Sequence, residues 1–210
     1  LAFGGVTLGY YGFAYDATKA LAVLEHAVAA EYVPFIVLLF SLYVISGGIC
    51  LRGDLAAHPV TNTAFLAVGA LAASLIGTTG ASMLLIRPLL QTNAERKHVK
   101  HTVIFFIFLV SNVGGCLLPV GDPPLFLGYL KGVPFFWTLC LWKEWAFAVA
   151  ALLVLYYLWD MLAYRHEGVA DIARDETERA ALTLAGKPNL VLLLGVVLGV
   201  AFIKPGEEFL

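Results

Sequence analysis

Residues 111–130 read "SNVGGCLLPVGDPPLFLGYL" and place four glycines, three prolines and one carboxylate in an otherwise apolar stretch. Glycine and proline interrupt helices, and an interruption inside a bilayer frees backbone N–H and C=O groups that lipid cannot pair. Irregular backbone at membrane depth is tolerated only where protein or a water-filled cavity satisfies those groups. The stretch therefore predicts a discontinuous helix that lines a site.

The composition of the whole chain places it in a membrane. Hydrophobic residues make up 60% and charged residues 13% of the 210 residues, with a mean hydropathy of +0.86; soluble domains have about 45–50% apolar and about 25% charged residues. Apolar runs close to the ~20 residues that cross a bilayer recur at 32–50, 102–118, 135–161 and 190–203. We expect an all-α membrane protein with several transmembrane helices, embedded in a lipid bilayer.

Charge and cysteine content exclude other classes of partner. A formal net charge of −2 gives no basic surface for nucleic acid. The three cysteines are widely spaced single residues, and the five histidines show no zinc-ligand spacing, so neither a redox pair nor a zinc site is predicted. We expect no cofactor beyond a coupling ion.

The opening stretch divides the segment 102–130 into two half-helices. Residues 102–113 would form a helix about 18 Å long that ends at Gly114 and Gly115. Asp122 followed by Pro123 is a typical helix start, with the carboxylate at the N-cap and proline in the first turn. The alternative is an extramembrane turn in which Asp122 caps a helix in water.

A second interruption, "GTTGAS" at 77–82, divides the apolar segment 63–90. Residues 63–76 and 81–90 would reach about 21 Å and about 15 Å, which is short of the ~30 Å hydrocarbon core. The segment is therefore either one kinked span or a re-entrant hairpin. The small residues could serve helix packing alone, or the hydroxyls of Thr78, Thr79 and Ser82 could coordinate an ion.

The polar groups at the long interruption suit a small cation. The oxygens of Ser111, Asn112 and Asp122, together with carbonyls freed at the end of the first half-helix, form a hard-oxygen environment for Na⁺ or a proton. The N-terminus of the second half-helix would instead favour an anion. A carboxylate at membrane depth is costly, so Asp122 is a candidate functional residue.

Basic residues predict the topology of the chain. They concentrate at 96–101 and 165–187, which the positive-inside rule places in the cytoplasm. We expect residues 1–164 to form one transmembrane repeat, 165–187 a solvated cytoplasmic helix or linker, and 188–210 the start of the next membrane region. Asp160, Glu144 and Arg87 are expected at interfaces rather than in a transport path.

Two motifs, "SLIGTTGASMLLIRPLL" and "SNVGGCLLPVGDPPLFLGYLKGVPFFWTL", resemble the ion transporter superfamily, in particular its NhaD-like sodium/proton antiporter and citrate-transporter-like branch. The similarity covers residues 35–138. It implies a carrier with two inverted repeats, each with a re-entrant hairpin and a broken helix whose tips meet near the middle of the membrane. This chain, which opens on Leu1 inside an apolar run, would be a fragment containing the first repeat.

The resemblance also implies a site. The hairpin tip would carry Thr78, Thr79 and Ser82, and the break around the coupling cation would be formed by Ser111, Asn112, Gly114, Gly115, Gly121 and Asp122. Antiporters of this type resemble one another in an Asp-Asn pair within the hairpin, whereas this chain has "SLIGTT" at 74–79, without a carboxylate.

The function expected from these features is secondary active transport. The main hypothesis is Na⁺/H⁺ antiport by alternating access in a bacterial inner membrane; the alternative is Na⁺- or H⁺-coupled movement of citrate, another carboxylate or arsenite. The sequence holds no GxSxG or HExxH motif, so an enzyme is not expected. A non-transporting subunit is a third hypothesis, and a homodimer stays open as the assembly.

Overall fold

The computed structural model describes residues 2–177 and 180–203. Its contacts divide the chain into two units, Leu1–Phe40 and Ser41–Leu210. Four helical stretches are long and apolar enough to cross a membrane, by length and composition: Ala17–Gly47, Pro59–Ile76, Lys100–Leu117 and Phe135–Tyr164. This confirms a mostly helical membrane protein.

The first unit contains the N-terminal helices. α1 (Ala2–Ala14) is followed by Asp16, whose side chain accepts a hydrogen bond from Ala17 N at 2.7 Å and so caps α2 (Ala17–His26). A π-helical turn, η1 (Ala27–Tyr32), leads directly into α3 (Val33–Gly47). The sequence predicts a span that opens at Pro34, after a separate interfacial helix. That boundary is wrong, because the π-helical turn η1 continues the helix into α3 and past Pro34, although proline has no backbone N–H to donate.

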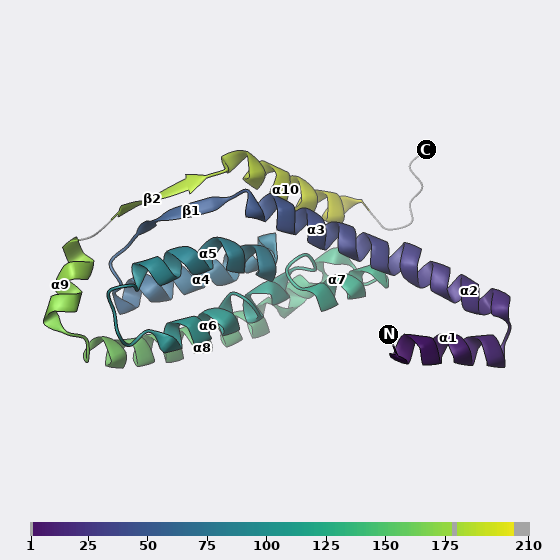
Figure 1. Ribbon diagram of the computed structural model, residues 1–210, viewed down its shortest axis with the longest axis horizontal. Helices are drawn as coiled ribbons and strands as arrows, with labels where there is room; N and C mark the ends of the chain where they lie inside the picture. Colours follow the sequence, from purple (N-terminus) through teal and green to yellow (C-terminus); the bar gives the residue numbers. More distant parts are fainter. Residues whose placement is uncertain (1, 178–179, 204–210) are drawn as a thin grey trace. The chain divides into compact units, whose positions relative to one another are not determined.

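A helical hairpin forms the centre of the second unit. α4 (Pro59–Ile76) and α5 (Thr78–Thr92) are separated only by Gly77, whose φ of 80° and ψ of 150° lie in a region that glycine alone adopts readily. Asn62 near the start of α4 and Asn93 just after α5 exchange side-chain hydrogen bonds of 2.8 and 3.0 Å. The chain therefore turns back at Gly77, which excludes the single kinked span (Figure 1).

The interruption in the hairpin is shorter than predicted. Residues 78–82 were expected in an irregular stretch, but they already belong to α5. Ala81 N donates to Gly77 O at 2.9 Å, so the helical ladder starts directly after the glycine. Only one residue is needed to reverse the chain, because the two helices meet end to end at a positive φ.

The broken helix is present, with one boundary displaced. α6 (Lys100–Leu109), the 3₁₀ turn η2 (Val113–Leu117) and α7 (Pro123–Leu130) follow one another. α6 ends four residues before the predicted Val113, because the carbonyl of Phe106 accepts from the N–H groups of both Val110 (2.8 Å) and Ser111 (3.2 Å), which breaks the i→i−4 ladder.

The two helices that complete the bundle are α8 and α10. The 3₁₀ helix η3 (Phe135–Leu141) leads into α8 (Trp142–Tyr164), the longest helix of the described residues. α6 and α8 lie side by side (Figure 1). The buried core is formed by apolar side chains of α4, α5, α6 and α8: Leu66, Ala70, Ala73, Ala81, Leu85, Leu89, Phe105, Phe106, Leu109, Val110, Val149 and Tyr156.

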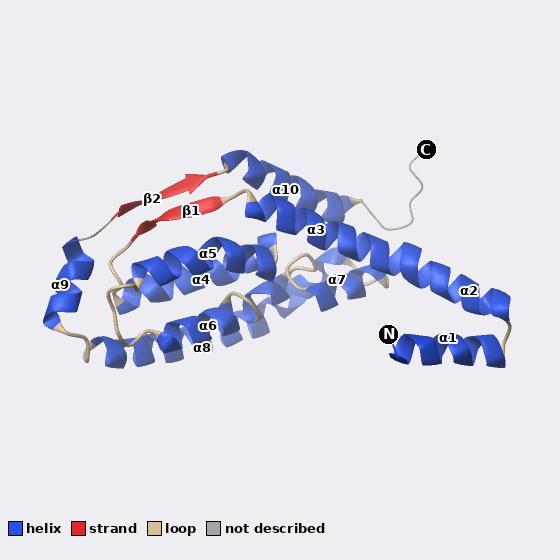
Figure 2. Cartoon of the chain, viewed as in Figure 1, coloured by secondary structure: helices blue, strands red, loops and turns tan. Residues whose placement is uncertain are grey.

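The predicted linker contains a helix and, in addition, a strand that the sequence does not predict. It comprises α9 (Val169–Thr177) and a strand, β2 (Ala180–Ala185), before α10 (Lys187–Phe202). β2 pairs antiparallel with β1 (Cys50–Asp54), in the register Cys50↔Ala185 (Figure 2). Gly53 has a φ of 147° and a Cβ built on it would lie 2.7 Å from the Cα of Leu182, so only glycine fits here. The predicted linker is therefore a folded part of the second unit.

Candidate functional site

The tip of the hairpin touches the break in the second helix. Thr78, the first residue of α5, donates its backbone N–H to the carbonyl of Gly121 at 3.0 Å. The hydroxyls of Ser82 and Ser111 are hydrogen-bonded at 2.8 Å. Ser74, on the last turn of α4, donates its hydroxyl to the carbonyl of Gly114. The two interruptions at 77–82 and 111–122 are thus in direct contact.

Glycines make this close contact possible. A Cβ at Gly115 would lie 2.5 Å from Cγ2 of Thr78 and 2.7 Å from the carbonyl oxygen of Gly121, and a Cβ at Gly114 would lie 2.8 Å from the backbone of Ala70. Side chains at these positions would push the break away from the hairpin. The two glycines therefore act in packing, and not as the helix stop that was predicted.

The carboxylate of Asp122 lies at the start of α7. Its backbone is extended (φ −138°, ψ 128°), Pro123 follows in the first turn, and the Asp122 carbonyl accepts from the N–H groups of Leu125 and Phe126 at 3.1 and 3.2 Å. The predicted N-cap position is confirmed. The side chain, however, makes no capping hydrogen bond and is half-buried. Its oxygens are thus available to another ligand.

Two other predicted residues lie towards the outside. Thr79 and Asn112 are exposed, and the carbonyl of Asn112 accepts from Gly115 N at 3.0 Å. Within the described ranges, no hydrogen bond links Ser111, Asn112 and Asp122 with one another, so the three predicted Na⁺ ligands are not assembled. Ser111 is bound instead to the hairpin.

The carbonyls of the break already have protein donors. The indole N–H of Trp145 donates to Val113 O at 3.0 Å, and the Thr138 hydroxyl donates to Leu117 O at 2.9 Å. Gly114 O and Gly121 O are bound by the hairpin as described above. Of these, only carbonyls at the end of the first half-helix were predicted as ion ligands; all four follow the rule that irregular backbone in a membrane is paired by neighbouring protein. The available polar groups are therefore side chains.

The contribution of η3 and α8 to this region was not predicted. Trp145 was interpreted only as an interfacial flank of Glu144, and Thr138 was not singled out. Thr138 lies 21 residues from Leu117, and Trp145 lies 32 residues from Val113, whose carbonyls they pair. The one local signal for the contact of Trp145 is its indole N–H, which needs an acceptor when buried and follows a stretch whose backbone carbonyls need donors.

A buried polar network closes the other end of the hairpin. Asp160 on α8 is fully buried and accepts from Arg96 Nη2 at 2.6 Å and from His101 Nε2 at 2.8 Å. Arg96 Nη1 and the amide of Asn62 lie 3.2 and 3.4 Å from its second oxygen. Asp160 was expected at an interface. The structure places it inside the protein because these partners compensate its charge.

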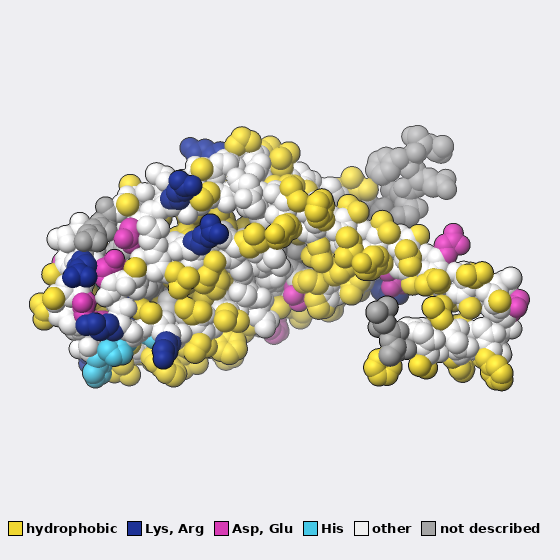
Figure 3. Space-filling view, in the orientation of Figure 1, with side chains coloured by type: hydrophobic (Ala, Val, Ile, Leu, Met, Phe, Trp, Pro, Cys, Tyr) yellow, Lys and Arg dark blue, Asp and Glu magenta, His cyan; other side chains and the backbone are white. Residues whose placement is uncertain are grey.

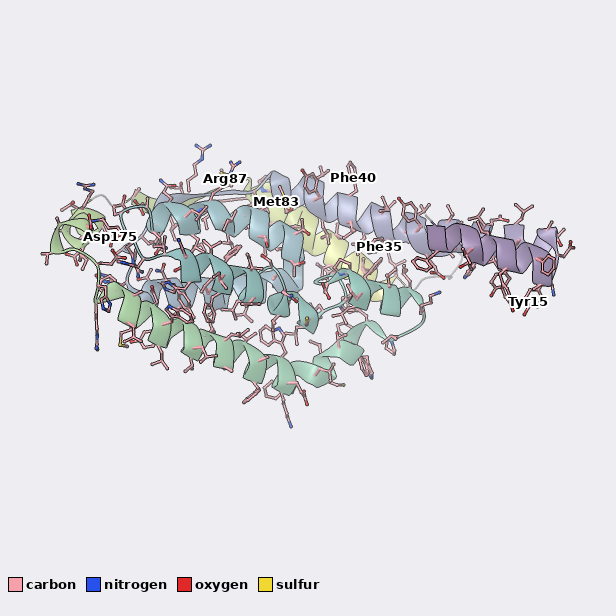
Figure 4. All side chains as sticks on the ribbon, turned by 60° about the horizontal axis from the view of Figure 1, so that its bottom comes forward. Tyr15, Phe35, Phe40, Met83, Arg87 and Asp175 are labelled. Carbon is pink, nitrogen blue, oxygen red and sulfur yellow. The ribbon has the colours of Figure 1, made fainter. Side chains whose placement is uncertain are left out.

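The connection beyond α8 strengthens this network. Glu167 accepts backbone N–H bonds from Lys97 (3.1 Å) and His98 (2.8 Å). Burial alone would raise the pKa of Glu167, but these two N–H groups and the nearby Arg96 guanidinium hold the pKa below its ordinary value. Asp175 on α9 accepts the N–H of Ala57 with both oxygens, at 3.0 and 3.1 Å (Figure 4). The base of the hairpin is thus held by residues from the predicted linker.

Comparison with known proteins identifies the family of the chain. Neither the curated proteins nor the solved structures contain a match. The model of the family described as "Putative citrate transport" matches residues 1–208, nearly the whole chain. The chain therefore belongs to this citrate-transport family of membrane transporters.

Proposed function

We propose that this protein carries citrate or a related carboxylate across the membrane, coupled to Na⁺ or H⁺. The bond between Thr78 N and Gly121 O carries the proposal, because it sets the N-terminus of α5 beside the N-terminus of α7. Helix N-termini have a partial positive charge that favours anions. α7, which begins with Pro123 and Pro124, contributes this charge without N–H groups, whereas the first turn of α5 also has N–H groups. Discontinuous helices of transporters use their N-terminal ends in this way.

Hydroxyl groups add to the anion-binding character of the tip. Ser82 lies one turn after Thr78 on α5 and is half-buried, whereas Thr79, which follows Thr78 directly, is exposed. Both can donate to a carboxylate. The side chain of Ser82 already engages Ser111 at 2.8 Å, so a substrate carboxylate at the tip would join an existing hydroxyl pair.

Asp122 gives the coupling. An ionised carboxylate next to the anion site repels a carboxylate substrate, and a proton or Na⁺ on Asp122 removes that repulsion. Cation and substrate then bind together more tightly than either binds alone. The lack of a side-chain capping bond at Asp122 supports this role, since its oxygens need not leave a protein donor in order to bind the cation.

Asp122 also supports a second candidate function, Na⁺/H⁺ antiport. One titratable carboxylate that binds either ion in turn is the minimum for exchange by competition. The absence of a carboxylate from residues 74–79 and the hydroxyl-rich tip favour carboxylate transport. In both proposals the hairpin is re-entrant, the chain forms the first of two inverted repeats in a bacterial inner membrane, and access alternates around the tip.

The experiment uses the full-length parent protein in proteoliposomes, with radiolabelled citrate outside and an imposed Na⁺ or pH gradient. We expect gradient-driven citrate uptake in the wild type. Asp122→Asn is expected to keep citrate binding but lose its dependence on the gradient, because a permanently neutral amide no longer responds to the cation.

The matched control is Asp171→Asn, which removes a carboxylate from α9 in the connection outside the spans. It should leave uptake unchanged. Sodium-dependent proton flux without citrate uptake would replace this proposal by antiport. Unchanged gradient dependence in Asp122→Asn would refute the coupling role of Asp122.

A further inference from the structure

An open groove of about 930 Å³ lies between α6 and α8, at the end of the second unit opposite the hairpin tip. Its apolar walls are Ile104 and Phe105 of α6 and Leu155, Leu158 and Trp159 of α8. Ile104, Leu155, Leu158 and Trp159 are each more than half exposed. The groove is thus an unfilled apolar channel along α6 and α8, which belong to the candidate membrane spans Lys100–Leu117 and Phe135–Tyr164.

One end of the groove is polar and basic. Lys97, His98 and Lys100 come from the start of α6 and the loop before it, and His166 follows the end of α8. Lys100 precedes Ile104 by one helical turn, so the charged and apolar parts lie in line on one face. Figure 3 shows lysine, arginine and histidine side chains gathered at this end of the unit.

Several cations at this end are paired with acidic groups, whereas Lys100 is not paired with any acidic group of the described residues. Lys97 Nζ is paired with Asp171 at 2.8 Å, His98 Nδ1 lies 3.5 Å from Glu167, and Asp160 is enclosed by Arg96 and His101. Across residues 2–177 and 180–203, Lys100 has no ion-pair partner, and its side chain is exposed at the rim. The groove therefore combines a free ammonium with an apolar channel.

We propose that this groove binds an anionic phospholipid of the surrounding leaflet. Its phosphate would meet Lys100 and the ring nitrogens of His98 and His166, and an acyl chain would lie along Ile104, Leu155 and Leu158. The arrangement matches an amphiphile with its charge at the level of the helix ends, where the bilayer surface lies. A free anion would use only the rim, and it would leave the apolar channel unfilled.

The site is separate from the proposed transport site, since its residues belong to the base of the bundle and not to the hairpin tip. Lipid at this position would cover the side of α6 and α8 that encloses the Asp160 network: Trp159 stacks on His101 at 6.2 Å between ring centroids, and His101 Nε2 donates to Asp160. The bound lipid would stabilise the helix pair.

The test is retention of lipid by the full-length parent protein in native mass spectrometry, after exchange into nanodiscs of equal phosphatidylglycerol and phosphatidylcholine. We expect phosphatidylglycerol to be retained preferentially by the wild type. Lys100→Gln should lower that retention about fivefold, the effect of one cation near an anionic surface. Ile104→Trp should lower it as well, because the indole fills the channel.

Lys143→Gln is the matched control, since Lys143 is an exposed lysine at the opposite end of α8; it should retain lipid like the wild type. Equal loss in Lys143→Gln and Lys100→Gln would overturn the proposal. Displacement of the lipid by inorganic phosphate alone, or no effect of Ile104→Trp, would also overturn it, because the apolar channel would then have no part in binding. If a second copy or another protein segment fills the groove instead, the wild type should retain phosphatidylglycerol and phosphatidylcholine equally, and the proposal would be overturned.

Discussion

The backbone N–H of Thr78 and the carbonyl of Gly121 are joined by a hydrogen bond of 3.0 Å. This bond connects the first residue of α5 to the residue before Asp122, although 42 residues of chain separate them. The hairpin and the broken helix therefore cannot move apart without breaking it. Any substrate at the tip contacts both elements.

Gly115→Ala tests the contact between these two elements. The new methyl would lie 2.5 Å from Thr78 Cγ2 and 2.7 Å from Gly121 O, so we expect a loss of stability of about 1–3 kcal/mol and loss of uptake. Gly128→Ala is the control, because its Cβ would find only Val133 Cγ2, at 3.9 Å. The measurements are thermal unfolding in detergent and proteoliposome uptake. Normal uptake in Gly115→Ala would show that the close contact is dispensable.

The pair Ser82 and Ser111 can be tested by a double-mutant cycle. Each alanine variant should raise the KM for substrate, and the double variant should be less harmful than the sum, with an interaction energy of about 0.5–1.5 kcal/mol. Thr177→Ala, at an exposed hydroxyl of α9, is the control. Strict additivity would mean that the 2.8 Å contact does not operate in the transport cycle.

The Asp160 network should dominate the stability of the second unit. Arg96→Met leaves the Asp160 carboxylate buried without its strongest partner, so we expect a loss of about 3–5 kcal/mol. Replacing both groups, as Arg96→Met with Asp160→Leu, should recover part of the loss, since the buried charge of Asp160 is then removed, while Glu167 still lacks the guanidinium that lies 3.7 Å from it. Thermal unfolding measures the order of stability of the wild type, Arg96→Met and the double variant. A double variant less stable than Arg96→Met alone would contradict this explanation.

Glu167 predicts a dependence of stability on acid pH. Its pKa in the folded protein is lowered from 4.5, so the unfolded chain takes up the proton first as the pH falls. The contribution of Glu167 is complete above that ordinary value, declines as the pH drops below it, and is lost below the folded-state pKa. The melting temperatures of the wild type and Glu167→Gln should therefore converge in acid. Glu25→Gln, at an exposed position of α2, should show no such convergence.

Local sequence predicted the two interruptions and their function class because both depend on neighbouring residues. "GDPP" sets a helix start through Asp122 and the ring of Pro123, and Gly77 supplies the one backbone conformation that reverses the chain. The exact end of α6 could not be predicted, because it depends on which N–H groups the carbonyl of Phe106 accepts. Nothing in the residue types distinguishes 109 from 113.

The missed features are contacts between distant residues. Asp160 and Arg96 are 64 residues apart, and a lone aspartate near a helix end is as consistent with an interface as with a buried pair. β1 and β2 have the same limitation: "CLRGD" and "AALTLA" show little strand character alone, and each becomes a strand because the other pairs with it. For this reason the strand within 165–187 was not predicted.

The β1–β2 ribbon has a consequence for biosynthesis. Its strands are joined across 131 residues, as the bond from the Thr183 hydroxyl to Arg52 O shows. A ribosome that adds about 5–20 residues per second needs roughly 7–26 s to make that length of chain. During this time β1 has no partner, while the hairpin, the broken helix and α8 emerge and can be inserted. The ribbon can therefore close only after the helices between its two strands have been synthesised.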